Sequence, residues 1–146
     1  WIVSLMLIGS AIGILTKTNV DTWYIELNRS PLTPPSHIFG IAWSILYAMI
    51  GMSGWLIWES KSFSDLQTIK KLYASQLILN WSWTPLFFSY HLTGIAFICL
   101  ALILILVAIL IVKTCKNLTT ASLLLIPYLL WLLFAGHLNF YIWQYN

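Results

Sequence analysis

Residues 77–88 read LILNWSWTPLFF, and they lie inside a long run without charged side chains. An amide without a hydrogen-bonding partner costs several kcal/mol in lipid hydrocarbon, so Asn80 is predicted to face other helices and not lipid. On a helix, Trp83 and Thr84 follow Asn80 by three and four residues and share its face. Pro85 removes one backbone hydrogen bond and can bend the helix at that point. A polar, aromatic and bent helix in the middle of the chain indicates a bundle built around an internal site.

The composition places the chain in a membrane. Of its 146 residues, 60% are hydrophobic and only 8% are charged, and the mean hydropathy is +0.87. A soluble domain of this size has too little interior to bury so many apolar side chains, whereas apolar runs of about 18 residues or more are typical of transmembrane helices. We therefore expect an all-α integral membrane protein in contact with membrane lipid.

Five apolar stretches predict a bundle of five transmembrane helices in a single domain, residues 1–146. The expected spans are residues 1–16, 36–58, 72–88, 92–112 and 118–143. Residues 17–35 are expected to form a long proline-containing loop between helices 1 and 2, because its prolines fix φ and prevent a continuous helix. Trp23 and Tyr24 in this loop are expected either to anchor it at the membrane interface or to act as a lid.

Basic residues divide unevenly between the two ends of such a bundle. The charged connections at residues 59–71 and 113–117 would share one side with the N-terminus. That side carries five basic residues against Lys17 and Arg29 on the other: Lys61, Lys70, Lys71, Lys113 and Lys116. Cytoplasmic loops carry the excess of Lys and Arg, so we expect the N-terminus in the cytoplasm. The net charge of +3 is small, which fits anionic lipid head groups and argues against nucleic acid as a partner.

Small residues and cysteines carry weaker signals. Gly9 and Gly13 have the spacing that lets two helices approach closely. Packing inside one bundle is the favoured interpretation, and a dimer interface is the alternative. Cys99 and Cys115 lie on one helix and its exit, roughly 24 Å apart at 1.5 Å per residue, too far for a disulfide bond. The chain begins at Trp1 without Met, so we expect residues before it to be missing, and no signal-peptide pattern is present.

No hydrolase, nucleotide-binding or metal-binding motif is found in the sequence. His37, His91 and His137 are widely separated and lack the spacing of metal ligands, so hydrogen bonding is the favoured role for each. Only His137, within the fifth expected span, is a candidate axial ligand for a metalloporphyrin. The second, fourth and fifth expected spans contain no Asp, Glu, Lys or Arg, which argues against acid–base catalysis and against an ion-coupled transporter.

Aromatic side chains remain as the candidates for function. The chain has nine tryptophans, and several lie inside expected spans, away from the membrane interface. Ala135 and Gly136 leave room in the fifth span where larger side chains would fill it. Six residues could wall a cavity for a flat, mostly apolar ligand: Trp43, Tyr47, Asn80, Trp83, Trp131 and Ala135. The alternative is a tightly packed core in which the tryptophans only fill space.

Several of these residues resemble the motifs of the TspO/MBR family, which includes the translocator protein, or peripheral benzodiazepine receptor. The first loop and second helix are matched by Trp23-Tyr24, Pro34-Pro35, Phe39-Gly40, Trp43 and Leu46-Tyr47. The third helix is matched by the stretch from Asn80 to Phe88, and the fifth by Pro127-Tyr128, Trp131, Phe134-Ala135 and Leu138-Asn139. The match covers nearly the whole chain, and it looks like a bacterial member, in a bacterial cell membrane.

The resemblance implies a five-helix bundle, often a homodimer, that binds tetrapyrroles such as protoporphyrin IX and lipophilic drugs of the benzodiazepine and isoquinoline carboxamide types. It implies a link to light-dependent oxidative breakdown of porphyrin and to stress responses, with no tightly bound cofactor. The pocket positions carried over are Tyr24, Trp43, Tyr47, Asn80, Trp131, Ala135 and Leu138.

The sequence departs from the family pattern at three places, one of which is Ile95, where animal members commonly have a tryptophan near the start of helix 4. Residues 29–32 read Arg-Ser-Pro-Leu where the family has Lys-Pro-x-Trp, so the aromatic residue of the lid is missing. The family's sterol motif needs Tyr and then Arg near the end of the fifth helix, where this chain has Phe140 and Gln144. Steroidogenic handling of cholesterol is therefore not expected.

Three hypotheses follow from the sequence. In the first, the protein binds porphyrin and promotes its photo-oxidative degradation, with Trp43 and Trp131 giving electrons to the excited ring. Arg29 or Lys17 would pair with the propionates. In the second, the same pocket carries porphyrins or other lipophiles passively across the bilayer. In the third, the protein is a ligand-responsive sensor.

Overall fold

The computed structural model describes residues 1–61 and 63–146, with residues 15–17 and 21 described as helical backbone only. Within these ranges the chain contains helices and no strand, so the all-α prediction is confirmed. The helices are α1 (Ile2–Asp21), α2 (Trp23–Glu26), α3 (Ser36–Glu59), α4 (Leu66–Thr84), the π-helical turn η1 (Pro85–Ser89), α5 (Thr93–Thr114) and α6 (Thr119–Tyr145).

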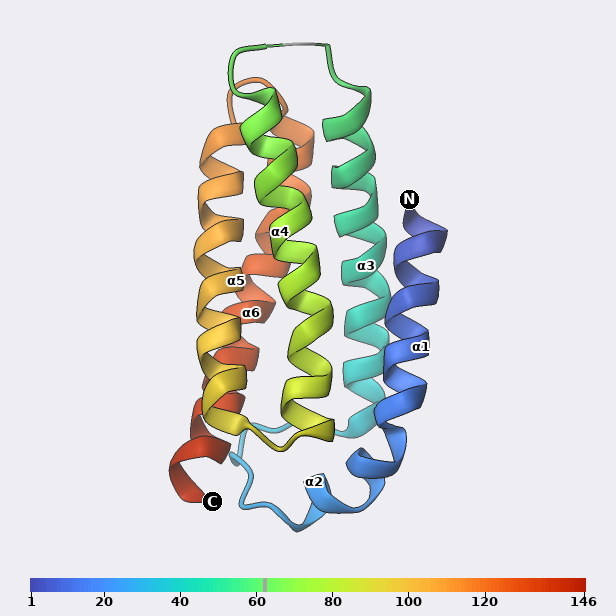
Figure 1. The fold of residues 1–146 in the computed structure, drawn as a ribbon, viewed down its shortest axis with the longest axis vertical. Coiled ribbons are helices and arrows are strands. Elements are labelled where there is room, and N and C mark those ends of the chain that lie inside the picture. Colours follow the sequence, from blue (N-terminus) through green and yellow to red (C-terminus); the bar gives the residue numbers. More distant parts are fainter. Residues whose placement is uncertain (62) are drawn as a thin grey trace.

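The long helices run side by side along one axis (Figure 1). Helix α5 packs against both α4 and α6, α3 packs against α6, and α1 lies at the edge of the bundle against α3. Helix α2 and residues 27–35 cross the end of the bundle at which α6 also finishes. The connection between α3 and α4, described at residues 60–61 and 63–65, and the connection at residues 115–118 lie together at the opposite end.

Three of the described helices, α3, α5 and α6, are long and apolar enough to cross a membrane. The count rises to four if the pair Ile2–Ile14 and Thr18–Glu26, bent by 51°, forms one broken span. Helix α4 has the length of a span but is not among them, because Lys70, Lys71, Gln76 and Asn80 interrupt its apolar sequence.

Two of the expected boundaries are wrong. Helix α1 continues to Asp21 and α2 to Glu26, so the non-helical part of the predicted loop is only residues 27–35. The prolines begin at Pro31, and residues 17–26 contain neither proline nor glycine to stop a helix. The second error is the connection predicted at residues 59–71. It shrinks to residues 60–65, since Leu66 and Ile69 are buried and extend the apolar stripe of α4 toward its N-terminus.

The predicted disturbance at Pro85 takes the form of a π-helical turn. Pro85 has no backbone N–H to donate, and the next turn widens so that the Tyr90 N–H donates to the Pro85 carbonyl at 3.0 Å. The Leu92 N–H donates to the Leu86 carbonyl, also at 3.0 Å. His91 between them has a φ of 56°, in the left-handed region. Wide turns of this type present side chains at functional sites, and this one presents Phe87 and Phe88.

Glycines allow the helices to approach at the places where aromatic side chains cross between them. A Cβ on Gly9 would overlap the ring of Tyr47, and one on Gly51 would lie 2.8 Å from Cα of Ile2. A Cβ on Gly54 would overlap the hydroxyl of Tyr73, which donates to the Ile50 carbonyl at 2.7 Å. Gly9 therefore packs against another helix of the same bundle. For Gly9, this agrees with the favoured interpretation of the Gly9 and Gly13 spacing.

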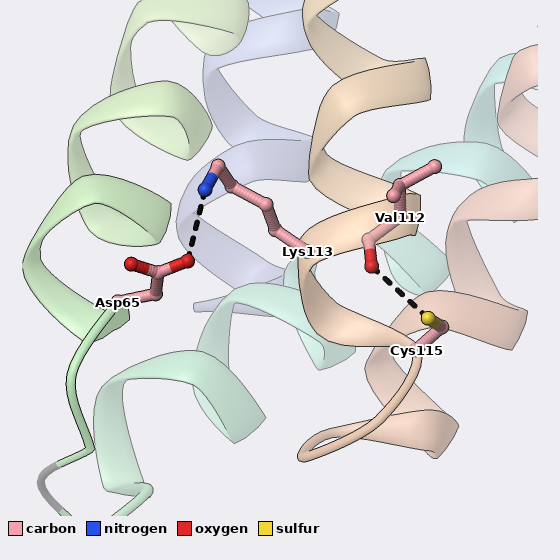
Figure 2. Close-up of polar contacts among 4 residues, drawn as sticks. All are labelled: Asp65, Val112, Lys113 and Cys115. Atoms are coloured by element: carbon pink, nitrogen blue, oxygen red, sulfur yellow. Dashed lines mark hydrogen bonds and ion pairs between the residues drawn. The ribbon is translucent and has the colours of Figure 1, made fainter.

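The end of the bundle with the short connections carries an ion pair. Lys113 Nζ lies 2.9 Å from Asp65 Oδ2 and joins the end of α5 to the start of α4, as Figure 2 shows. Both side chains are partly exposed, so such a pair contributes little to stability. The nearby Cys115 thiol donates to the Val112 carbonyl at 3.0 Å, and both Cys115 and the buried Cys99 are free thiols.

Gly54→Ala is expected to lower the free energy of unfolding by about 1–3 kcal/mol, because the new methyl group displaces the buried hydroxyl of Tyr73. Gly136→Ala in α6 is the matched control, since a Cβ there meets nothing within 4 Å and alanine favours a helix by about 0.5–1 kcal/mol. Thermal unfolding of both variants in detergent tests this. Equal midpoints for the two variants would contradict the tight packing at Gly54.

Candidate functional site

A large cleft lies at the end of the bundle covered by α2 and residues 27–35. Its volume is about 1420 Å³, above the roughly 300–1,000 Å³ usual for small-molecule sites. Its walls come from α1, α2, residues 27–35, α3, the end of α4 with η1, and α6. Seven of the eight predicted ligand-binding residues line it: Tyr24, Trp43, Tyr47, Trp83, Trp131, Ala135 and Leu138.

Helices α3 and α6 supply one aromatic wall. Trp43 and Tyr47 follow each other by one turn, with ring centroids 5.4 Å apart. Trp131 of α6 meets Trp43 edge to face at 6.5 Å and Phe39 at 5.9 Å. Ala135, one turn after Trp131, leaves the space in front of these rings open. The two tryptophans predicted to donate electrons thus lie together on this wall.

Helix α2 and the turn η1 supply an opposing aromatic group. The Tyr24 ring meets Phe88 at 5.5 Å and Phe87 at 6.1 Å, both edge to face. Trp83 stacks on Phe87 at 5.3 Å, and its indole N–H donates to Asn139 Oδ1 at 3.1 Å. This bond fixes the indole of Trp83 against α6. Trp83 therefore lines the cleft with its apolar ring, while its nitrogen is hydrogen-bonded to α6.

Asn80, the eighth predicted ligand-binding residue, does not line the cleft. It is 4% exposed and lies behind Tyr47, whose hydroxyl donates to Asn80 Oδ1 at 2.9 Å. Asn80 Nδ2 donates to the hydroxyl of Tyr128 at 2.8 Å, and that hydroxyl donates to Gln76 Oε1 at 3.2 Å. The prediction that Asn80 faces other helices is confirmed, but its amide is used to join α3, α4 and α6.

Residues 27–35 cover the mouth of the cleft and are tied to α6. The Asn28 N–H donates to Asn146 Oδ1 at 2.8 Å, and Asn146 Nδ2 donates back to the Asn28 carbonyl at 3.1 Å. Ser30 Oγ lies 3.2 Å from Nε2 of His137. His137 therefore contacts this strap, residues 27–35, and does not line the cleft, and no sequence pattern predicts a partner so far along the chain.

Of the two basic residues predicted to pair with propionates, Arg29 lies at the mouth of the cleft. Arg29 is exposed and lines the cleft, with its guanidinium carbon 5.4 Å from the centre of the Tyr24 ring. The side chain of Lys17 lies outside the described residues. In the part of the chain that the structure describes, no group of three His, Cys, Asp or Glu side chains could hold a metal ion.

Several residues that line the cleft were not predicted from the sequence. Phe39, Phe87 and Phe88 belong to the stretches that resemble a known family, but only their tryptophan and tyrosine neighbours were carried over as pocket residues. Met6 and Ser10 of α1 also line the cleft. Their spacing of four residues gives them one helix face, yet apolar residues occur on every face of α1 and do not mark this face as the internal one.

Comparison with known proteins gives a match along almost the whole chain. A model described as the TspO/MBR family matches residues 1–144. A tryptophan-rich protein TspO from Archaeoglobus fulgidus is 38% identical over 99% of this chain and 94% of its own length. The translocator protein of Ovis aries is 40% identical over 85% of this chain and 75% of its own, and the protein CrtK of Rhodobacter capsulatus 30% over 85% and 78%.

Asn80→Leu is expected to lower the free energy of unfolding by about 1–3 kcal/mol, because it leaves the hydroxyls of Tyr47 and Tyr128 short of a partner in the bundle. Tyr47→Phe removes one interhelical hydrogen bond and is expected to cost about 0.6 kcal/mol. Ser82→Ala is the control, since Ser82 Oγ donates only to the Ile78 carbonyl of its own helix. Unfolding in detergent tests the series, and an Asn80→Leu variant as stable as Ser82→Ala would contradict the network.

Proposed function

Because this chain belongs to the TspO/MBR family, we propose that its cleft binds a tetrapyrrole such as protoporphyrin IX and promotes light-dependent oxidative degradation of that ring. The observation that carries the proposal is a cleft of about 1420 Å³ between two groups of aromatic side chains. A flat, largely apolar macrocycle is larger than a typical small ligand and stacks well on indole and phenol rings. Lipophilic ligands of the benzodiazepine and isoquinoline types would use the same surfaces.

The degradation step would depend on Trp43 and Trp131. An excited porphyrin is a strong oxidant and takes one electron from an indole beside it, leaving a tryptophan radical cation and a reduced ring that reacts with dioxygen. The cleft contributes by holding ring, indole and oxygen together, which replaces a chance encounter with a fixed geometry. The edge-to-face contact of the two indoles at 6.5 Å gives the ring two donors on one wall.

The charged end of the ligand would lie at the mouth of the cleft. Among the residues that the structure describes, Arg29 is the basic side chain at this position. A guanidinium binds a carboxylate with two parallel hydrogen bonds. Its position over the ring of Tyr24 places it beside the aromatic group that α2 and η1 supply. Lys17 remains the second candidate for pairing with a propionate.

We also propose that all five long segments cross the membrane, including α4 and the bent pair formed by α1 and α2. Four polar or aromatic side chains of α4 make hydrogen bonds to other helices: Tyr73, Gln76, Asn80 and Trp83. Side chains whose polar atoms are bonded in this way lie at low cost beside lipid-exposed helices, and of these four only Gln76 keeps a buried atom, Nε2, without a partner among the described residues. The end with five lysines would then face the cytoplasm. A homodimer would have to use a face other than Gly9, because Tyr47 of the same chain covers it.

The decisive measurement is a titration of the detergent-purified protein with protoporphyrin IX, first in darkness and then under illumination. Saturable binding followed by loss of the porphyrin absorption band, faster than for free porphyrin, is expected. The Trp43→Phe/Trp131→Phe double variant should still bind and should lose the acceleration. Degradation by the double variant at the wild-type rate would contradict the role of the two indoles. Binding without accelerated loss would favour a passive carrier or a sensor.

The role of Arg29 is tested with Arg29→Gln and two ligands. Affinity for protoporphyrin IX is expected to fall by up to about fivefold, the equivalent of an exposed ion pair of roughly 0.2–1 kcal/mol. Affinity for the dimethyl ester of protoporphyrin, which has no carboxylate, should not change. Lys116→Gln at the other end of the bundle is the control. An equal loss with both ligands would show that Arg29 acts through packing and not through charge.

A further inference from the structure

A second hollow lies on the outside of the bundle, between α3 and α6. It has a volume of about 370 Å³ and is lined by apolar side chains at the spacing of one helix face on each side. Helix α3 contributes Ala42, Ile45, Leu46 and Met49, and α6 contributes Pro127, Leu130, Trp131 and Phe134. We refer to this surface as the α3–α6 groove.

Trp131 is the one described residue that lines both the α3–α6 groove and the cleft. On α3 the two surfaces use adjacent stripes, with Trp43 and Tyr47 on the cleft side and Ala42 and Leu46 on the groove side. No residue of α3 is shared. The indole of Trp131 is thus the partition between the internal cleft and the outside of the bundle.

The partition is held only by packing. The indole nitrogen of Trp131 is buried and has no hydrogen-bonding partner among the described residues, in contrast to that of Trp83. Pro127, one turn earlier in α6, cannot donate a backbone hydrogen bond to residue 123, which weakens the helix locally. On the α3 side of the groove, Ala42 has a small side chain, which leaves space beside that helix.

Lipid hydrocarbon is the medium outside this partition. Both α3 and α6 are among the helices apolar enough to cross a membrane. All the side chains that line the groove are apolar, and Ile45 (56% exposed) and Leu130 (61% exposed) face outward, whereas Leu46 is buried. An apolar hollow in that position is filled by whatever the bilayer offers, because an empty one forfeits dispersion contacts. The occupant in the absence of other ligands is therefore a lipid acyl chain.

We propose that the α3–α6 groove is a lateral entry site, through which lipid-dissolved apolar ring molecules pass into the cleft when the indole of Trp131 turns aside. This inference rests on the proposed function, since it assumes that the cleft receives such a ligand. It adds a route from the hydrocarbon phase, so that the strap of residues 27–35 need not open for the ligand to enter.

The route is tested by filling the groove and measuring binding kinetics in lipid nanodiscs that contain protoporphyrin dimethyl ester. Ala42→Trp occupies the groove without altering any residue that lines the cleft, and Met49→Trp serves as a second variant. Ile41→Trp is the matched control, because Ile41 is 57% exposed and lines neither hollow. Obstruction changes the barrier and not the bound state, so association and dissociation should both slow while the dissociation constant stays the same.

The expected slowing is roughly tenfold in both rates, within the range of about one to three decades over which association rates vary among variants of one site. Wild-type rates in Ala42→Trp and Met49→Trp would overturn the entry route while leaving the proposed function intact. A loss of affinity with unchanged association would overturn it too, because the groove would then be part of the bound state. Absence of any binding by the wild-type protein would overturn the proposed function itself.

A second measurement needs no porphyrin. Lipids with brominated acyl chains quench tryptophans that touch the chains, so the quenched part of the protein emission should fall in Trp131→Phe and fall less in Trp43→Phe. No loss of quenching in Trp131→Phe would show that acyl chains do not reach Trp131 and would overturn the occupant assigned to the groove. The result of this quenching experiment does not depend on whether the protein degrades porphyrin.

Discussion

The fold depends on the hydrogen bonds that join the polar side chains of α4 to its neighbours. Tyr73, Gln76, Asn80 and Trp83 succeed each other by three or four residues, which gives them one face of the helix. Each makes a hydrogen bond to α3 or α6. In hydrocarbon the alternative for such groups is to have no partner, so α4 has a preferred rotation about its axis. The positions of α3 and α6, and with them the aromatic wall of the cleft that these two helices supply, follow from that rotation.

The same network explains why the cleft ends where it does. Tyr47 uses its hydroxyl to reach Asn80 and presents its ring both to the cleft and to Gly9 of α1. One side chain therefore closes the floor of the cleft, joins α3 to α4 and sets the distance of α1. Beyond this floor, toward the lysine-rich end, the space between the helices is filled by buried Ile50, Ile103 and Leu125. The open volume is confined to the end where Ala135 and the strap leave room.

Sequence alone could predict the membrane class, the inward orientation of Asn80 and seven of the residues that line the cleft, because each follows from hydropathy, from helix spacing or from a family resemblance. It could not predict that Asn80 bonds to Tyr47 and Tyr128, since an amide needs some partner but its position on a helix does not identify which. The continuation of α1 past Lys17 was missed for a related reason. Polar residues are compatible with both a loop and an exposed helix, and the prolines that decide the matter begin only at Pro31.

Trp83 and Trp131, which both line the cleft, differ in what holds their indole rings in place. The indole nitrogen of Trp83 is bonded to Asn139, whose own Nδ2 donates to the Thr93 carbonyl at 2.8 Å, so this ring is anchored to α5 and α6. The indole nitrogen of Trp131 has no such partner among the described residues. A ring held only by packing can change its position at the cost of contacts that an incoming apolar ligand restores. On the proposed entry route, Trp131 would therefore combine contact with hydrocarbon and freedom to turn with a place on the cleft wall, where the proposed ligand would bind.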